Sequence, residues 1–283
     1  MKKTVFRIFC VFFALCLLSG CGKLQVERKD PHGSDSLRVM SFNVCGWNYK
    51  NVKHLAAKTI LAYDADLVGL QECGYACYKG LMQDLEGYSF VGVGRENGRL
   101  DKNSGESCGI LYKTEKFTLL DSGTFWLSET PEIPGKGWDA DYVRICTWAV
   151  FRENATGREF AHVNTHLENI DDGTGVEALE KGTRMVIEKA LSFDVPVLLT
   201  GDFNFAKDTA YYSAVLEAGF RDSQDTAIRT VEGPTYHGGP EEHIDYVFLG
   251  GEIAAVEAYQ IVKDSYEGVY PSDHYPIYVD LKL

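Results

Sequence analysis

Apolar residues recur along this chain in short runs and alternations that predict strands, and in one longer stretch with helical spacing. The predicted strands cover residues 37–43, 67–70, 107–112, 145–151, 160–166, 197–199, 244–249 and 277–283. The clearest helix is predicted at 176–192, where apolar residues return about every 3.6 positions, and shorter helices are predicted at 52–63 and 210–218. Polar stretches rich in Gly or Pro at 94–105 and 130–137 predict loops. Strands mixed with helices in this way predict an α/β domain.

Several polar residues stand where the predicted strands end. The apolar run 197–199 leads into Asp202 and Asn204, and the strand period of two predicts that these two side chains point the same way. Asp273 and His274 precede the final strand, so they also lie at a strand mouth. A carboxylate, an amide, a second carboxylate and an imidazole at two strand ends indicate a chemical site.

Further candidates lie upstream of these strand ends. Asn43 ends the first strand, and Glu72 follows the second. Glu72 is the best metal-ligand candidate, because Mg²⁺ prefers carboxylate oxygens, waters and phosphate oxygens. In the strand 160–166, alternation places His162, Asn164 and His166 on one face.

Asp245 is an acid among apolar neighbours in the strand 244–249. A buried acid needs a partner, and His274 is the natural candidate. These groups suit the hydrolysis of a phosphate ester, for which an enzyme must remove roughly 20 kcal/mol of barrier. A divalent cation would polarise the phosphoryl group, Asp202 would take a proton from the attacking water, and His274 would hold the phosphate.

Six blocks carry a family resemblance, and they occur along the chain in the family's order: Asn43, Gln71 with Glu72, 164–167, 201–204, 244–246 and 272–274. Together they resemble the endonuclease/exonuclease/phosphatase superfamily, whose fold is DNase I-like. The resemblance implies a four-layer α/β sandwich, in which two mixed β-sheets pack face to face with helices outside. It spans nearly the whole chain after the leader.

The same resemblance implies roles for individual residues. The expected metal ligands are Glu72, Asn43 and Asp273, with Mg²⁺ as the cofactor and Mn²⁺ as its substitute. The expected catalytic residues are Asp202, His274, Asp245, Asn204 and His166, of which His166 and Asn204 also contact the phosphate. His237 lies in a stretch that resembles a substrate-contacting loop of the family, and Arg144 matches a weaker family block.

Each of these residues also has a structural alternative. Asp202 and Asn204 are residue types that favour turns after strands, and Glu72 is compatible with a solvated loop. His166 is compatible with a satisfied core histidine, and Asp245 with a cap on a neighbouring turn. Asn43 is compatible with a backbone hydrogen bond at a strand end. His162 has no motif behind it, and we interpret it as structural.

The first twenty residues have the pattern of an export signal. Lys2, Lys3 and Arg7 precede an apolar run, and Cys21 follows a stretch typical of a bacterial lipoprotein cleavage site. We therefore expect residues 1–20 to be a signal peptide and Cys21 to be lipidated. Residues 21–35 form the expected flexible tether, and 36–283 the catalytic domain. The expected location is outside the cytoplasm on a bacterial membrane; a plain secretory signal is the alternative.

Charge narrows the class of substrate. The chain has 28 Lys and Arg against 41 Asp and Glu, a net charge of −13. Loss of residues 1–20 removes three cations and no anions, which leaves 25 cations against 41 anions, or −16. Nucleic-acid binding relies on a basic patch, and none stands out, so long polyanions are disfavoured. A phosphorylated small molecule or a lipid headgroup fits better.

The cysteine pattern does not indicate a disulfide scaffold. Cys10 and Cys16 lie in the signal, and five cysteines remain in the domain: Cys45, Cys73, Cys77, Cys108 and Cys146. We interpret them as mostly structural, with one disulfide as an open alternative.

The chain is expected to act as a monomer.

The leading hypothesis is a lipid-anchored, Mg²⁺-dependent hydrolase of phosphomonoesters or phosphodiesters. A secreted Mg²⁺-dependent nuclease is the alternative within the enzyme class. A non-catalytic surface binding lipoprotein is the alternative from another class.

Overall fold

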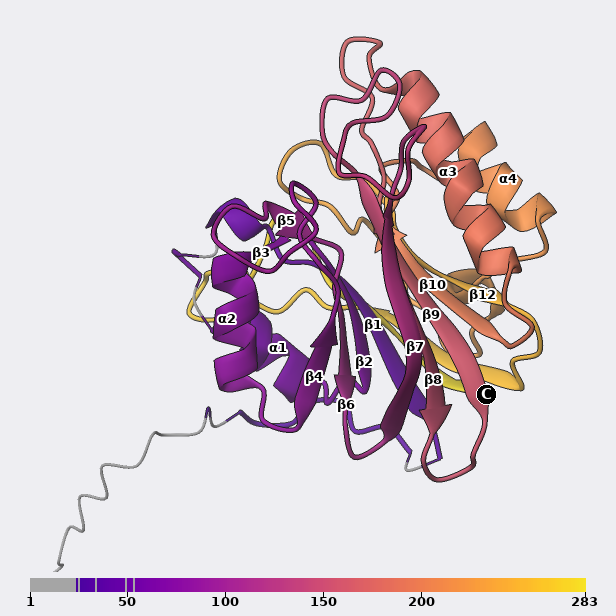
Figure 1. The fold of residues 1–283 in the computed structure, drawn as a ribbon. Helices are drawn as coiled ribbons and strands as arrows, with labels where there is room; N and C mark the ends of the chain where they lie inside the picture. Colours follow the sequence, from indigo (N-terminus) through magenta and orange to yellow (C-terminus); the bar gives the residue numbers. More distant parts are fainter. Residues whose placement is uncertain (1–23, 25, 34, 49, 53) are drawn as a thin grey trace, which may run out of the picture.

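The structure is a computed structural model that describes residues 24, 26–33, 35–48, 50–52 and 54–283. Two six-stranded sheets form its centre (Figure 1). The first sheet has the order β13 (Ala255–Ile261), β14 (Ile277–Lys282), β1 (Leu37–Asn43), β2 (Leu67–Gln71), β6 (Ile110–Lys113) and β4 (Tyr88–Val91). The second has the order β11 (Arg221–Asp222), β12 (Asp245–Gly250), β10 (Val197–Asp202), β9 (Glu159–His166), β8 (Ile145–Glu153) and β7 (Phe117–Trp126). A short pair, β3 (Cys73–Gly74) and β5 (Glu106–Ser107), stands apart.

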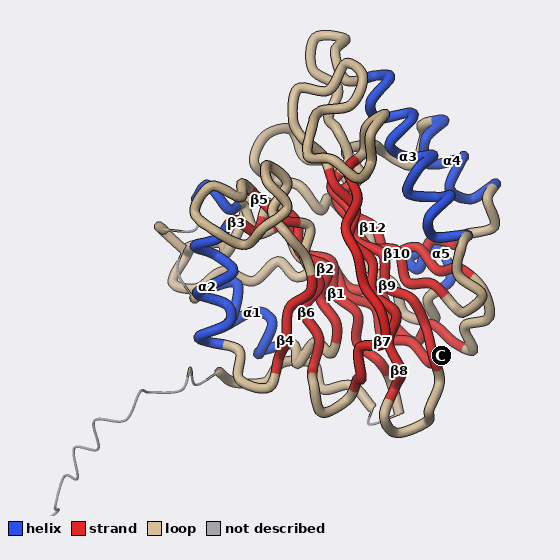
Figure 2. Tube along the Cα trace, viewed as in Figure 1, coloured by secondary structure: helices blue, strands red, loops and turns tan. Residues whose placement is uncertain are grey.

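Helices cover the outer faces of both sheets, which gives four layers (Figures 1 and 2). The helices α1 (Leu55–Ala62) and α2 (Tyr75–Asp84) lie against the first sheet, and α3 (Val176–Leu191) and α4 (Ala210–Glu217) lie against the second. The short helices η1 (Gly46–Asn48) and α5 (Ser223–Thr226) complete the set among the described residues. The predicted DNase I-like sandwich is therefore confirmed.

Three apolar clusters fill the spaces between these layers. One lies between the sheets and joins Val39 and Ile277 of the first to Phe160 and Leu198 of the second. The other two join each sheet to its own helices. Both faces of the central strands are buried, which explains why β10 begins with an apolar run and why neither β1 nor β10 alternates cleanly between apolar and polar residues.

Strand direction brings the polar strand ends together. Strand β1 runs parallel to β2, with Asn43 beside Gln71 in register. Strand β9 runs parallel to β10, with His166 beside Asp202, and β12 pairs antiparallel so that Asp245 also stands beside Asp202. Residues from both sheets therefore meet at one end of the sandwich.

Side-chain hydrogen bonds join the two sheets close to that end of the sandwich. Asn164 of β9 donates to the Leu70 carbonyl of β2 at 2.8 Å and accepts from Gln71 at 2.7 Å. This close approach needs glycine at position 69, because a Cβ there would lie 2.1 Å from the Thr200 hydroxyl. The contacts fix how the strand ends of one sheet face those of the other.

Most predicted elements are confirmed, with several corrections. The run 107–112 is broken into β5 and β6, and the helix predicted at 52–63 begins only at Leu55. The prediction lacked α2, β4, β7 and β13. Strand β7 is an edge strand with many exposed residues, so it has no apolar run to reveal it.

The predicted signal peptide and Cys21 lie outside the described residues. In the segment predicted as a tether, Lys29 pairs with Asp264 at 2.8 Å, and the Asp30 carbonyl accepts from Arg38 at 2.8 Å. These contacts hold this part of the segment against the domain, near the start of β1. Among the described residues, no helix has the length and apolar character needed to span a membrane.

Candidate active site

A pocket of about 430 Å³ lies where the strand ends of the two sheets meet. Six of the predicted site residues line it: Glu72, His166, Asp202, Asn204, Asp273 and His274. Asn43 and Asp245 are buried and hydrogen-bond to members of this set. The structure thus brings together residues that are up to 202 positions apart, from Glu72 to His274, in the sequence.

Asn43 links two carboxylates across the sandwich. Its amide nitrogen donates to Glu72 at 3.1 Å and to Asp202 at 2.9 Å. Its amide oxygen accepts from the Cys45 backbone N–H at 3.0 Å. In this arrangement Asn43 positions the carboxylates, and a role as a direct metal ligand would require its oxygen and nitrogen to exchange places.

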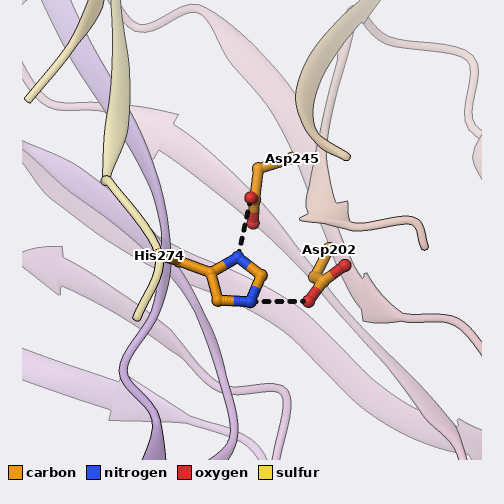
Figure 3. Close-up of side chains that lie close together, drawn as sticks. All are labelled: Asp202, Asp245 and His274. Carbon is orange, nitrogen blue, oxygen red and sulfur yellow. Dashed lines mark hydrogen bonds and ion pairs between the residues drawn. The ribbon is translucent and has the colours of Figure 1, made fainter. Parts of the chain in front are cut away.

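His274 lies between two aspartates (Figure 3). Its Nδ1 is 2.8 Å from Asp245, and its Nε2 is 3.6 Å from Asp202. Burial alone would lower the pKa of His274, but the two neighbouring carboxylates raise it to about 10. The imidazole is therefore a buried cation, and the predicted pairing of Asp245 with His274 is present.

The charged forms of two pocket carboxylates, Glu72 and Asp202, are disfavoured by their surroundings. Burial, together with the nearby Glu106, raises the pKa of Glu72 to about 7. Burial likewise raises the pKa of Asp202 to about 6, despite the opposing effect of His274. The negative charges of Glu72 and Asp202 are therefore not fully balanced by the cationic side chains around them.

Two pocket residues have left-handed backbone conformations. Glu72 has φ = 57° and Asn204 has φ = 52°, although neither is glycine. Such conformations are uncommon outside glycine, although asparagine adopts them more readily than glutamate, and they are often found at functional sites. The expected reason for the shared direction of Asp202 and Asn204 is wrong: β10 ends at Asp202, and a turn rather than the strand period places Asn204.

The histidines separate into different environments. His166 is buried, and its Nε2 is 3.4 Å from Asp202; burial lowers its pKa well below the usual value, so the ring is neutral. His162 is buried against Thr200, as expected for a structural histidine. His237 does not line the pocket: its ring stacks on Tyr275, with centroids 4.1 Å apart, and the neighbouring Tyr236 reaches the pocket instead.

The pocket also has a cationic wall that the sequence motifs did not reveal. Arg95, from the loop after β4, and Arg144, just before β8, both line it. Tyr142 lies beside them, with its ring centroid 5.6 Å from the Arg95 guanidinium carbon and 5.1 Å from that of Arg144. Arg144 matched only a weak block, and Arg95 lies in a stretch predicted simply as a loop.

The donor set of the site fits a hard divalent cation. Asp202, Asp245 and His274 offer one ligand atom each within 4.8 Å of one another, and all three are buried. Glu72 and Asp273 add two more carboxylates to the pocket. Both ring nitrogens of His274 already face carboxylates, so the carboxylate oxygens of Glu72 and Asp273 are the better donors.

Comparison with known proteins identifies the family. Residues 40–274 match the Endonuclease/Exonuclease/phosphatase family. The chain belongs to this family. A member of this family from Bacteroides vulgatus has a solved structure that is 31% identical; the match covers 88% of this chain and 99% of that one, with a TM-score of 0.80.

Two further relatives of this chain have names that state an activity. A mannosyl-6-phosphatase from Bacteroides thetaiotaomicron is 32% identical over 88% of this chain and 100% of that chain, with a TM-score of 0.80. A CCR4-Not complex 3'-5'-exoribonuclease subunit from Candida albicans is 23% identical over 66% of this chain, but over only 29% of its own length. The chain spans 60% or less of the first curated relatives that it matches.

All five cysteines of the described domain are free and buried. The disulfide left open by the sequence is therefore not formed in this structure, and the cysteines pack within the apolar clusters or beside the pocket. This agrees with their interpretation as mostly structural.

Proposed function

We propose that this protein is a divalent-metal-dependent phosphoesterase that hydrolyses a phosphorylated small molecule, with a sugar phosphate as the leading substrate. The observation that carries the proposal is the pocket itself, where buried carboxylates lie beside a histidine cation at the joined strand ends. The similarity to a mannosyl-6-phosphatase over almost the whole domain supports the substrate class.

Each residue has a proposed role in this reaction. Glu72 and Asp273, with Asn43 positioning Glu72, would hold Mg²⁺ or, as a substitute, Mn²⁺. The cation would polarise the phosphoryl group and offset its developing charge. Asp202 accepts a proton from the attacking water, and its pKa of about 6 suits a base that works near neutral pH.

The remaining residues bind and stabilise the phosphoryl group. The carboxylate of Asp245 keeps His274 charged and oriented, so that His274 stabilises negative charge on the phosphoryl oxygens. His166, as a neutral imidazole, and Asn204 contact the phosphate. The water oxygen bonds to phosphorus as its proton passes to Asp202, and the phosphorus–oxygen bond to the alcohol breaks. The departing alkoxide takes a proton from solvent water, and Asp202 returns its proton to solvent.

A nuclease is the second candidate, favoured by the similarity to a 3'-5'-exoribonuclease subunit. The net charge of −13 opposes it, because a long polyanion would be repelled outside the pocket. The exoribonuclease likeness is also lower in identity and covers less of both chains than the phosphatase likeness. RNA and DNA oligomers therefore belong in the substrate panel as competitors.

We also propose export and lipid attachment at Cys21. An anchor there would join the domain near Lys29 and the start of β1, which is about 20 Å along the strand from Asn43. Cys21→Ala should move the protein from the membrane fraction to the soluble fraction without changing its turnover of soluble substrate.

A metal-supplemented substrate panel tests the enzymatic proposal. Purified protein should release phosphate from one or more sugar phosphates with Mg²⁺ or Mn²⁺, and should stop after chelation. His274→Ala should lose this activity, whereas His54→Ala, which changes an exposed histidine, should retain it. Turnover that survives both chelation and His274→Ala would reject the mechanism, and faster turnover of oligonucleotides would favour the nuclease.

A further inference from the structure

The cationic wall of the pocket contains donors that the protein leaves unused. Arg144 is 6% exposed, and its Nη2 donates to Glu168 and Asn169 at 3.1 Å each. Its Nε–H is buried and has no acceptor among the described residues. A buried guanidinium donor without a partner is costly, so an acceptor from a ligand in the pocket is a physical explanation.

Arg95 repeats this pattern from another segment. Its Nη1 pairs with Glu106 at 2.7 Å, while its Nε makes no hydrogen bond within the described chain and lies 3.5 Å from Glu96. The two arginines also line a small recess beside the pocket together with Glu72 and His166. The unused donors are therefore close to the residues that we assign to the metal and the phosphate.

Glu168 holds this wall in place. Its carboxylate is 1% exposed and accepts from the Tyr142 backbone N–H at 3.0 Å as well as from Arg144. Glu168 comes two residues after His166, so one short stretch fixes both a phosphate-binding histidine and the arginine wall. A guanidinium that is fixed before the ligand binds loses little entropy on binding.

We propose that Arg95 and Arg144 bind a terminal phosphate and make the enzyme selective for phosphomonoesters over phosphodiesters. This inference rests on the proposed phosphoesterase function. A monoester presents three non-bridging oxygens and close to two negative charges near neutral pH, because its second pKa is about 6. A diester presents two such oxygens and one charge.

The number of oxygens decides the selectivity. Two oxygens suffice for the groups that carry out the reaction, and the third oxygen of a monoester accepts from the arginine wall. In a diester that oxygen carries the second alcohol, so the buried guanidinium donors stay unpaired. A site built to hydrogen-bond a group discriminates strongly against an analogue that lacks it.

The test compares a matched pair of substrates, p-nitrophenyl phosphate and methyl p-nitrophenyl phosphate, with the metal-loaded enzyme. The variants are Arg95→Met, whose arginine is partly exposed, and Arg144→Lys, which keeps the charge beside Glu168. Arg152→Met is the control, because Arg152 lies on β8 in an exposed ion pair outside the pocket. Binding of inorganic phosphate, measured by calorimetry, supplies a readout independent of turnover.

The wild-type enzyme should prefer the monoester. Arg95→Met and Arg144→Lys should lower its kcat/KM by about 10- to 100-fold and that of the diester by less than about 3-fold, with a matching loss of phosphate affinity. The control should change neither. An equal fall for both substrates, or a wild-type preference for the diester, overturns the inference. Failure of the proposed function would show as no turnover in the sugar-phosphate panel. If the nitrophenyl esters are not hydrolysed, calorimetry alone decides the inference: weaker phosphate binding in Arg95→Met supports the subsite, and unchanged binding rejects it.

Discussion

The buried charges at the two ends of strand β1 differ in whether they have partners of opposite sign. Near its start, Arg38 forms two hydrogen bonds of 2.7 Å to Asp280, and both residues are 2% exposed or less. Close by, Asp66 pairs with Lys113 and Lys116 at 2.8 Å each. Although burial opposes it, these lysines lower the pKa of Asp66. Each of these buried charges has a partner of opposite sign.

At the far end of β1, the carboxylates outnumber their partners. Glu72 and Asp202 have raised pKa values because burial and neighbouring acids disfavour their charged forms. Both ends are buried, so burial alone does not mark the site. Removal of one partner from the compensated cluster would leave a buried charge unpaired, whereas the uncompensated cluster indicates a place where an external cation and a ligand bind.

The largest effect should come from Asp202→Asn at the uncompensated end. Without its base, kcat/KM in the presence of metal should fall by about 10²- to 10⁴-fold. Stability without metal should stay equal or rise, because the substitution removes a destabilised buried charge. Steady-state kinetics and thermal unfolding measure the two effects, with the partly exposed Asp264→Asn as a control. Full activity in Asp202→Asn would assign the base elsewhere.

At the compensated end, a substitution should lower stability and leave activity unchanged. Arg38→Met leaves Asp280 buried without its partner, so the free energy of unfolding should fall by about 3–5 kcal/mol, while the folded fraction keeps its activity. Urea denaturation measures this change. The double variant Arg38→Met with Asp280→Leu should recover most of it. A single variant as stable as the wild type would mean that the pair contributes little.

Mg²⁺ should stabilise the folded protein by binding at the uncompensated end of β1. At a concentration 100 times its Kd, Mg²⁺ should raise the free energy of unfolding of the wild type by about 2.7 kcal/mol. Glu72→Gln should lose most of this gain, and Glu153→Gln, far from the pocket on β8, should keep it. Unfolding curves with and without Mg²⁺ make the comparison. An undiminished gain in Glu72→Gln would remove Glu72 from the metal site.

The smallest expected effect is a pH dependence at the compensated end. Because the folded protein lowers the pKa of Asp66 below 3.8, its pairing stabilises the protein above pH 3.8, and this contribution is lost as the pH falls through the folded value. Melting temperatures across the acid range should therefore decline more steeply for the wild type than for Asp66→Asn. Parallel slopes would show that other carboxylates dominate acid unfolding.

Sequence patterns predicted some parts of this structure better than others. Buried strand β10 begins with an apolar run, and β1 is mostly apolar around Arg38 and Ser41, so hydrophobicity indicates the positions of both. Edge strand β7 and helix α2 were missed because their exposed residues blur the pattern. Motif residues such as Asp202 and His274 were predicted because they directly flank such strands.

The sequence by itself determined the family, the layered fold and the set of residues at the strand ends, because these depend on local patterns and short blocks. Only the tertiary structure decided which groups share one electrostatic environment. It turned His237 toward Tyr275 and placed Tyr236 in the pocket. It also joined Arg95 and Arg144 into one wall, since pKa values and unused donors depend on contacts between segments far apart in the chain.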